Sequence, residues 1–381
     1  MTQAVSTGGG SRGGLEGVVA TQSDICFIDG QAGRLVYRGY DIGDLVENTS
    51  FEEVAHLLWD NKLPTRQELA TLRSQLGANM ALPRYAQAIL KALPPQMQPM
   101  DALRTVASSL GAIDPDLTSN EPAADRRKAI RLTAQFPTIV TAFHRIRNNQ
   151  EPIDPDPSLS VAGNFLYMLN GKKPHQTLER VMDAALVLHA EHGMNASTFA
   201  ARVTAATLAD MHAAITAALG ALKGPLHGGA NQDVMELLLT CGDANAAEQK
   251  VRAMLSSGQK VPGFGHRVYR TFDPRATFLR KMSRELGEAA GNTKWYEMSE
   301  RLIPIVKQMK DKDPNVDFFS ASAYYTMAIP LDLFTPIFAI ARVAGWAAHV
   351  MEQHSNNRII RPTDDYTGPL DLKVTPIDQR K

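Results

Sequence analysis

Apolar residues recur at three- and four-residue steps along most of this chain, and this spacing limits the possible folds more than any other feature. One run follows Ser50, and its apolar face consists of Phe51, Val54, Leu57 and Leu58. Glu53, three residues after Ser50, completes a capping-box pattern typical of a helix start. Pro64-Thr65 precedes a second run with Leu69, Leu72 and Leu76. The pattern predicts a mostly α-helical protein.

Residues 18–40 contain the clearest strand signal. Cys26-Phe27-Ile28 runs into Asp29-Gly30, and Leu35-Val36-Tyr37 follows Gly33. Two β-prone runs joined by turn residues predict a small hairpin with a longer turn. The expected fold class is therefore mostly α, with a small N-terminal β-hairpin.

The length and charge of the chain bound its organisation and its partners. A chain of 381 residues is too long for one compact core, so we expect two domains or one large domain with an insertion. Basic and acidic residues number 40 each, which argues against nucleic acid or an anionic membrane as partner. Any anionic ligand must therefore be held by a local cluster of basic side chains.

The cysteines, the polar N-terminal stretch and the most apolar stretch of the chain bear on the cellular location of the protein. Cys26 and Cys241 are far apart, which argues against a disulfide framework or a metal site and fits a reducing cytoplasm. Residues 1–14 are rich in Gly and Ser and predict a flexible tail, not a signal peptide. The stretch 329–350 is interrupted by Pro330, Asp332 and Arg342, and so falls short of the roughly 20 apolar residues that a bilayer requires.

Two glycine-rich stretches each present a single histidine. His227 lies in KGPLHGGAN, and His266 lies in KVPGFGHRVYR. Glycines let the backbone approach a ligand closely, and a histidine on such a loop can donate a hydrogen bond to a developing oxyanion. The alternative is a loop histidine between ordinary helix-ending residues. The repetition of the design favours the functional interpretation.

One carboxylate and one arginine stand in apolar surroundings. Asp317 is flanked by Val316 and Phe318, a setting that raises the pKa of a carboxyl group and suits a general base. The alternative for Asp317 is a helix N-cap. Arg342 lies among apolar residues of a predicted helix, where a guanidinium needs a carboxylate partner. Either a protein acid or a bound substrate acid could supply that carboxylate.

Two further histidines follow helical spacing. His189 and His192 continue the register of Leu178, Val181 and Ala185, and Gly193 follows where a C-cap glycine belongs. The spacing predicts His192 in the last turn of a helix, where it stays a candidate for a functional role. His189 is predicted to be a core histidine whose hydrogen bonds are made within the protein. With loop histidines, one carboxylate and several arginines, the inventory favours proton transfer on a small carboxylic acid.

Longer motifs extend this inventory and occur in one order along nearly the whole chain. They are GLEGVVAT, LVYRGYDI, SFEEVAHLLW, PMDALR, HAEHGMNASTFAARV, GPLHGGAN, VPGFGHRVYRTFDPRA, PNVDF, FAIAR and IIRP. In sequence and order these motifs resemble the citrate synthase family.

The resemblance implies a mostly α-helical, two-domain homodimer whose active sites use residues of both subunits. After the tail 1–14, residues 15–227 together with 329–381 would form the large, dimer-forming domain. Residues 228–328 would form the small domain, which binds CoA and closes over the substrates. The expected reaction condenses acetyl-CoA with oxaloacetate and water to citrate and CoA, through an enol or enolate and citryl-CoA. Acetyl-CoA is a co-substrate, and neither a metal nor a bound cofactor is implied.

The resemblance also assigns roles by position. Asp317 is similar to the base that removes a methyl proton, His227 to the donor to the thioester oxygen, and His266 to the donor to the oxaloacetate carbonyl. The oxaloacetate-binding set comprises His192, Arg275, Arg342 and Arg361, with Arg361 reaching the site of the partner subunit. The expected CoA contacts are Val261, Pro262, Gly263, Gly265, Arg270 and Lys310, with Lys312 competing for the place of Lys310.

Two other functions remain open at this point. A 2-methylcitrate synthase would use propionyl-CoA with the same catalytic residues, and one extra methylene is worth only about 1–3 kcal/mol in a pocket. A non-catalytic helical sensor of CoA esters or dicarboxylates would need no base, so the presence of Asp317 beside two loop histidines argues against it.

Overall fold

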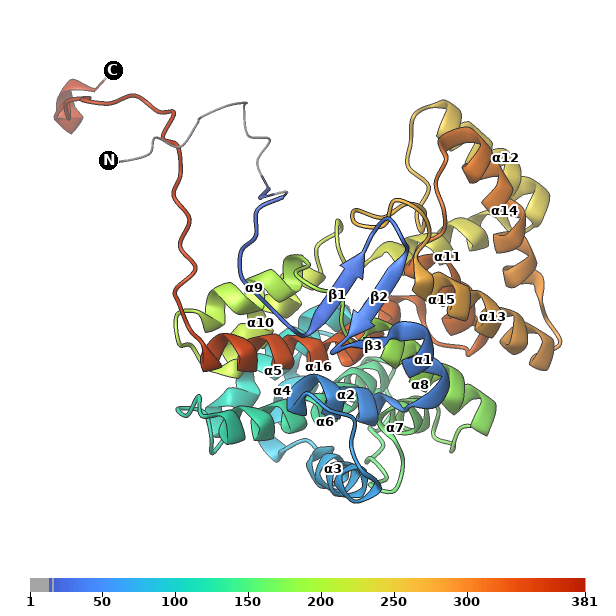
Figure 1. The fold of residues 1–381 in the computed structure, drawn as a ribbon, viewed down its shortest axis with the longest axis horizontal. Helices are drawn as coiled ribbons and strands as arrows, with labels where there is room; N and C mark the ends of the chain where they lie inside the picture. Colours follow the sequence, from blue (N-terminus) through green and yellow to red (C-terminus); the bar gives the residue numbers. More distant parts are fainter. Residues whose placement is uncertain (1–13, 16, 381) are drawn as a thin grey trace.

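The computed structural model describes residues 14, 15 and 17–380, so the tail predicted for residues 1–14 lies outside the described residues except for Gly14. The described chain is mostly helical, as expected (Figure 1). In chain order the helices are α1 Ile42–Asn48, α2 Phe51–Asp60, α3 Arg66–Asn79, α4 Arg84–Ala92, α5 Pro99–Leu110, α6 Pro122–Arg147, α7 Val161–Asn170, α8 Gln176–His189, α9 Ala196–Ala205, α10 Met211–Leu222, α11 Ala230–Cys241, α12 Ala244–Ser256, α13 Pro274–Ala289, α14 Lys294–Lys310, α15 Val316–Thr326 and α16 Phe334–Ser355.

The predicted hairpin is present. Strand β1 (Cys26–Asp29) pairs antiparallel with β2 (Arg34–Tyr37), with Cys26 opposite Tyr37 and Asp29 opposite Arg34. The Asp29 carboxylate accepts hydrogen bonds from the backbone of Gln31 and Ala32, both at 2.9 Å, and so closes the longer turn. A third short strand, β3 (Tyr40–Asp41), pairs with β2 and was not expected from the sequence.

Helix starts follow the local signals in the sequence. The Glu53 carboxylate accepts the Ser50 N–H at 2.8 Å, and Glu68 accepts the Thr65 N–H at 2.8 Å, so both capping boxes form. Each pair satisfies backbone N–H groups that the first helical turn would leave unbonded. These two confirmed starts fix the entry of α2 and α3 into the core.

The end of α8 differs from the prediction. The helix ends at His189 with Ala190 as its C-cap, so His192 lies beyond the helix and not in its last turn. Gly193 has a φ of +59° in the following turn. The buried Tyr37 hydroxyl donates to the Glu191 carbonyl at 2.7 Å, and this tertiary bond replaces a helical one. The chain therefore leaves the helix three residues earlier than the apolar spacing indicates.

Helix α16 is the centre of the core. It contacts α2, α6, α8, α9 and α10, and nearly all of its side chains are buried. Contrary to our expectation, residues 331–355 are long and apolar enough to cross a bilayer by length and composition alone. The most apolar window of this segment is wholly buried inside the protein, as in the core helix of a globular fold.

Helices α11 to α15 pack mainly against one another and form a group at one side of the molecule (Figure 1). Helix α13 also contacts α1 and α8, and α11 also contacts α16, so this group borders the rest of the helical body. The boundaries at residues 228 and 328 stay a prediction. After α16 the chain runs in extended form away from the helices (Figure 1).

Candidate active site

His227 lies on the turn between α10 and α11, and this turn is built around glycine. The Gly228 N–H bonds to the Leu222 carbonyl at 2.9 Å, and a Cβ on Gly228 would lie only 2.6 Å from that oxygen. The Ser197 N–H donates to Nε2 of His227 at 3.3 Å, and the Ser197 hydroxyl lies 2.8 Å from the same nitrogen. Because Nε2 accepts, the proton of a neutral imidazole is on Nδ1.

His266 is held in the opposite tautomer. Its Nδ1 accepts backbone N–H groups of Val268 at 3.0 Å and Tyr269 at 3.3 Å, so the proton is on Nε2. Burial and the charge of Arg275 lower the pKa of His266 to about 4. Burial and the charge of Arg342 lower the pKa of His227 to about 4 as well. Both imidazoles are therefore neutral hydrogen-bond donors at neutral pH.

Asp317 lies in the first turn of α15, but it is not the N-cap. Asn315 takes that position, and its side-chain oxygen accepts the Asp317 N–H at 3.0 Å. The capping alternative for Asp317 is therefore wrong, and its carboxyl group is not used to close the helix end. Burial raises the pKa of Asp317 to about 7, with Arg275 and Arg342 opposing that rise and Asp273 adding to it. A carboxyl group with that pKa suits a general base near neutral pH.

Arg275 is buried, and the Nε–Nη2 edge of its guanidinium is paired with a carboxylate. Its Nε donates to Oδ1 of Asp273 at 2.9 Å, and its Nη2 donates to Oδ2 at 2.8 Å. Asp273 also caps α13 by accepting the Arg275 N–H at 3.1 Å and accepts the Val316 N–H at 3.0 Å. The same carboxylate thus joins the starts of α13 and α15, and brings Arg275 next to Asp317.

Arg342 has no such partner. It is 1% exposed, and its Nε donates to the His189 carbonyl at 2.7 Å. Its guanidinium carbon lies 4.6 Å from the centre of the Phe338 ring. Among the described residues no carboxylate lies in ion-pair contact with it, and Nη2 has no hydrogen-bond partner. The sequence allowed either a protein acid or a substrate acid as the partner of Arg342. The geometry favours a carboxylate of the substrate.

His192 joins this group from the segment after α8. Its ring lies 5.0 Å from the ring of His266, centre to centre, and its Nε2 lies 3.1 Å from the Tyr269 hydroxyl. Burial, with the charge of Arg275, holds the pKa of His192 well below its ordinary value. The structure therefore gathers His192, His266, Arg275 and Asp317 around one region, with Arg342 and His227 meeting at the Phe338 ring.

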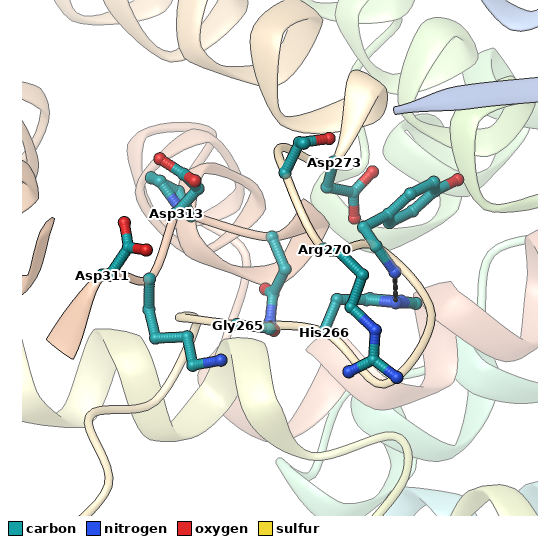
Figure 2. A pocket seen from close by; sticks show the side chains of 11 residues that line it. Gly265, His266, Arg270, Asp273, Asp311 and Asp313 are labelled. Carbon is teal, nitrogen blue, oxygen red and sulfur yellow. Dashed lines mark hydrogen bonds between the residues drawn. The ribbon is translucent and has the colours of Figure 1, made fainter. Parts of the chain in front are cut away.

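The loop expected to bind CoA runs along the segment that precedes α15. Gly265 N–H bonds to the Asp313 carbonyl and Asn315 N–H bonds to the Gly263 carbonyl, both at 2.9 Å. Gly263 has a φ of +78°, and a Cβ there would lie 2.8 Å from the Phe318 ring, so only glycine fits. Figure 2 shows the adjoining pocket, with Gly265, His266 and Arg270 on one segment and Asp311 and Asp313 on the facing one.

The charges around this pocket leave two cations uncommitted. Lys307 forms ion pairs with both Asp311 and Asp313, at 2.9 and 2.8 Å. Within the described range neither Arg270 nor Lys312, which both line the pocket, forms an ion pair. Lys310 ends α14 with its side chain exposed and does not line this pocket.

Arg361, like Lys310, does not join the other predicted site residues in this chain. It is exposed in the extended segment after α16. Sequence reasoning also missed residues that support the site, namely Ser197, Tyr269 and Asp273. Of these, Asp273 carried a usable signal, because an Asp before Pro-Arg is a common N-cap pattern.

Comparisons with known proteins identify the family of this chain. Residues 14–363 match the protein family described as "Citrate synthase, C-terminal domain". The chain is 50% identical to "Citrate synthase 2" of Bacillus subtilis over 96% of this chain and 98% of that protein. It is 49% identical to "Citrate synthase" of Haloferax volcanii and 42% identical to "2-methylcitrate synthase" of Shewanella oneidensis, over 96% of this chain in both cases and 98% and 97% of those proteins.

Solved structures give the same result. Citrate synthase of Pyrobaculum aerophilum aligns with a TM-score of 0.92 at 37% identity over 100% of both chains. Citrate synthase of Thermoplasma acidophilum, solved as a ternary complex with carboxymethyl coenzyme A and oxaloacetate, aligns with a TM-score of 0.90 at 32% identity over 96% of this chain and 98% of that one. The helical fold and this site define an enzyme that transfers acyl groups by condensation. The chain belongs to the citrate synthase family.

Proposed function

We propose that this protein condenses acetyl-CoA with oxaloacetate and water to give citrate and CoA. The observation that carries the proposal is the combination of one carboxyl group of raised pKa, Asp317, with two neutral histidines of fixed and opposite tautomer. A thioester α-proton is a poor acid, so a carboxylate can remove it only when a donor stabilises the developing enolate oxygen.

Oxaloacetate is proposed to bind first, at the two buried arginines. Arg342 offers an unpartnered Nη2 to one carboxylate, and Arg275, oriented by Asp273, faces the same region. His192, which shares a hydrogen bond with Tyr269, completes the pocket. The Nε2–H of His266 then donates to the ketone oxygen and makes the ketone carbon more electrophilic.

The carbon–carbon bond forms between the acetyl methyl group and that ketone carbon. Asp317 takes a proton from the methyl group while the Nδ1–H of His227 donates to the thioester oxygen, which gives the enol or enolate. The new carbon nucleophile attacks the ketone carbon, and the ketone oxygen takes the proton of His266. Water then adds to the thioester carbonyl of citryl-CoA and returns a proton to His266, while the proton held by Asp317 goes to the departing CoA thiolate. Citrate is released after its new carboxyl group loses a proton to solvent.

For the CoA phosphates we propose Arg270 and Lys312, because both line the pocket beside His266 and neither is committed to a carboxylate within the described chain. Lys310 stays a weaker candidate, since its side chain lies outside this lining. The backbone of Val261, Pro262, Gly263 and Gly265 would approach the coenzyme along the glycine loop. Closing of residues 228–328 over the substrates would exclude water from the enolate.

We also propose a homodimer with shared active sites. The support is the extended segment after α16, which exposes Ile359, Tyr366, Leu370, Leu372 and Val374 at 60% or more. Exposed large apolar residues on an extended segment fit the surface of a second copy, where Arg361 would reach the partner's site. A cytoplasmic location is proposed as well, in keeping with two free cysteine thiols.

The test is release of free CoA thiol by the purified protein with oxaloacetate and acetyl-CoA. We expect release that depends on oxaloacetate. The variant Asp317→Asn should fold and keep the oligomeric state of the wild type, while kcat falls about 10²–10⁴-fold because the general base is lost. Near-normal turnover in that variant would refute the assignment of the base.

A second candidate, condensation of propionyl-CoA, is favoured by one observation, the 42% identity to the Shewanella 2-methylcitrate synthase. The same assay with propionyl-CoA decides between them. A higher kcat/KM with acetyl-CoA supports the first proposal, and a higher value with propionyl-CoA replaces it. No thiol release with either thioester from a folded protein would support the non-catalytic sensor.

A further inference from the structure

Glu191 is a buried carboxylate for which the reaction has no role. It lies between α8 and α9, directly before His192, and is 0% exposed. A Cβ on Gly345 would lie 2.2 Å from Oε2 of Glu191, so the carboxylate rests directly on the backbone of α16. Gly345 lies between Arg342 and His349 in α16, with about one helical turn to either side. Glu191 therefore covers the stretch of α16 that links these two residues.

Within the part of the chain that the structure describes, one oxygen of Glu191 has a side-chain hydrogen-bond partner. His349 Nε2 lies 3.0 Å from Oε1, and Nη1 of Arg202 lies 3.0 Å from Nδ1 of the same histidine. Because arginine can only donate, Nδ1 of His349 accepts, and the Nε2 proton goes to Glu191. Oε2 has no hydrogen-bond partner among the described residues.

Arg342 is likewise buried with one polar atom left without a hydrogen bond, but its charge is positive. Its Nε is bonded to the His189 carbonyl, and its Nη2 is buried without a partner in the described chain. Glu191 packs against Gly345, one turn from Arg342 in α16, yet Glu191 and Arg342 are not within ion-pair contact of each other. Burial would raise the pKa of Glu191, but His349 and Arg342 outweigh burial and keep that pKa below its ordinary value, so the carboxylate is ionised at neutral pH.

This spacing has a functional meaning. A buried guanidinium without any counter-charge is strongly unfavourable, while one that is fully paired has no free donor for a ligand. A carboxylate that is near Arg342 but not bonded to it compensates the charge and leaves Nη2 available. When a second carboxylate binds to Nη2, the two anions share one cation and repel each other.

We propose that Glu191 is a positioning residue that acts through Arg342, as the built-in counter-ion of its guanidinium, and that it limits the affinity of the site for oxaloacetate. This inference rests on the proposed function. Glu191 keeps Arg342 oriented in the free enzyme and favours release of the carboxylate product. The cost is weaker binding of the ketoacid than the arginines alone would give.

The test is calorimetric titration of oxaloacetate into Glu191→Gln at low chloride. Glutamine keeps the shape and the acceptor for His349 but removes the charge, so we expect Kd to fall on the order of tenfold. The melting temperature of the ligand-free variant should fall as well, because Arg342 loses its counter-charge. A merely structural role predicts the opposite sign for binding, since a displaced Arg342 binds less tightly. Unchanged or weaker binding in a folded variant overturns the proposal.

Glu52→Gln is the matched control. Glu52 is a glutamate with 1% exposure in α2, where its Oε1 accepts the Val161 N–H at 2.8 Å. Its Oε2 has no hydrogen bond in the described chain and lies 3.9 Å from Nη2 of Arg73, not near Arg342. Its substitution should leave the oxaloacetate Kd unchanged, and a tenfold decrease there would overturn the proposal.

A second variant keeps the proposal open to refutation if Glu191→Gln does not fold. His349→Phe removes the donor to Glu191, so that carboxyl group gains a proton more easily and oxaloacetate should again bind more tightly. Weaker or unchanged binding in that variant overturns the proposal.

Wild-type protein that neither binds oxaloacetate nor releases thiol refutes the proposed function itself. Wild-type protein that does both, with variants that do not bind more tightly, refutes only the role of Glu191.

Discussion

Arg275 at the start of α13 and Arg342 in the middle of α16 are both buried, yet their charges are compensated differently. Arg275 makes two parallel hydrogen bonds to Asp273, whose carboxylate also caps α13 and bonds to the start of α15. Arg342 has a backbone carbonyl, an aromatic face and a carboxylate at a distance. Desolvation of an ion costs several kcal/mol, so a fold can bury a cation only when a compensating charge is near.

The difference teaches what each arginine can do. A bidentate pair fixes the geometry of Arg275 and makes it part of the framework that orients Asp317. The charge of Arg342 is compensated by a carboxylate to which it is not hydrogen-bonded, so its Nη2 stays free to donate. This makes Arg342 the stronger candidate for direct substrate binding. We therefore expect Arg275 to contribute to the stability of the fold as well as to the site, and Arg342 to act mainly on the ligand.

The largest expected effect is on stability, from Asp273→Asn. This change leaves Arg275 buried without its counter-charge, and we expect the free energy of unfolding to fall by about 3–5 kcal/mol. Urea unfolding measures it, with Asp365→Asn in the exposed C-terminal segment as control. A loss below about 1 kcal/mol would mean that the pair is not the framework element described above.

Arg342→Met should give the reverse profile. We expect KM for oxaloacetate to rise about a hundredfold, because a charged hydrogen bond to the substrate is lost. The free energy of unfolding should change by less than in Asp273→Asn, since no bonded ion pair is broken. Steady-state kinetics and urea unfolding of the same preparation check both statements. Equal losses of stability in the two variants would remove the distinction between the arginines.

The smallest effect concerns pH. Asp317 must be ionised in the enzyme–oxaloacetate complex to act as base, so kcat/KM for acetyl-CoA should fall at low pH. Burial raises the pKa of that carboxyl group to about 7 in the ligand-free protein. Arg342 stabilises the ionised form, so in Arg342→Met this limb should move to higher pH. The measurement is kcat/KM for acetyl-CoA from pH 5.5 to 9 at saturating oxaloacetate, a range that extends at least about 1 pH unit on each side of the expected midpoint. An unmoved limb would show that Arg342 does not act on the base.

Much of the fold follows from local signals in the sequence. The capping boxes at Ser50 and Thr65 and the hairpin at residues 26–37 form as predicted, because each involves neighbours along the chain. The end of α8 was predicted three residues too late. There the hydroxyl of Tyr37, far away in the sequence, bonds to Glu191 and interrupts the helix.

The site shows the same limit. Loop histidines among glycines and an acid in apolar surroundings are visible in one dimension, so His227, His266 and Asp317 could be selected. The capping alternative for Asp317 remained open until Asn315, two residues earlier, was seen to take that role. The tautomers of the histidines depend on backbone N–H groups of Ser197, Val268 and Tyr269, whose directions no residue pattern reveals.

Three residues of α16 lie one turn apart and point to different parts of the site. Arg342 is the proposed contact for the ketoacid, Trp346 donates at 3.1 Å to the Ser197 hydroxyl that orients His227, and His349 bonds to Glu191. In the proposed mechanism, ketoacid binding and thioester activation thus both depend on side chains of the single helix α16. A bend in α16 is therefore expected to impair ketoacid binding and thioester activation together, because both depend on residues held by this one helix.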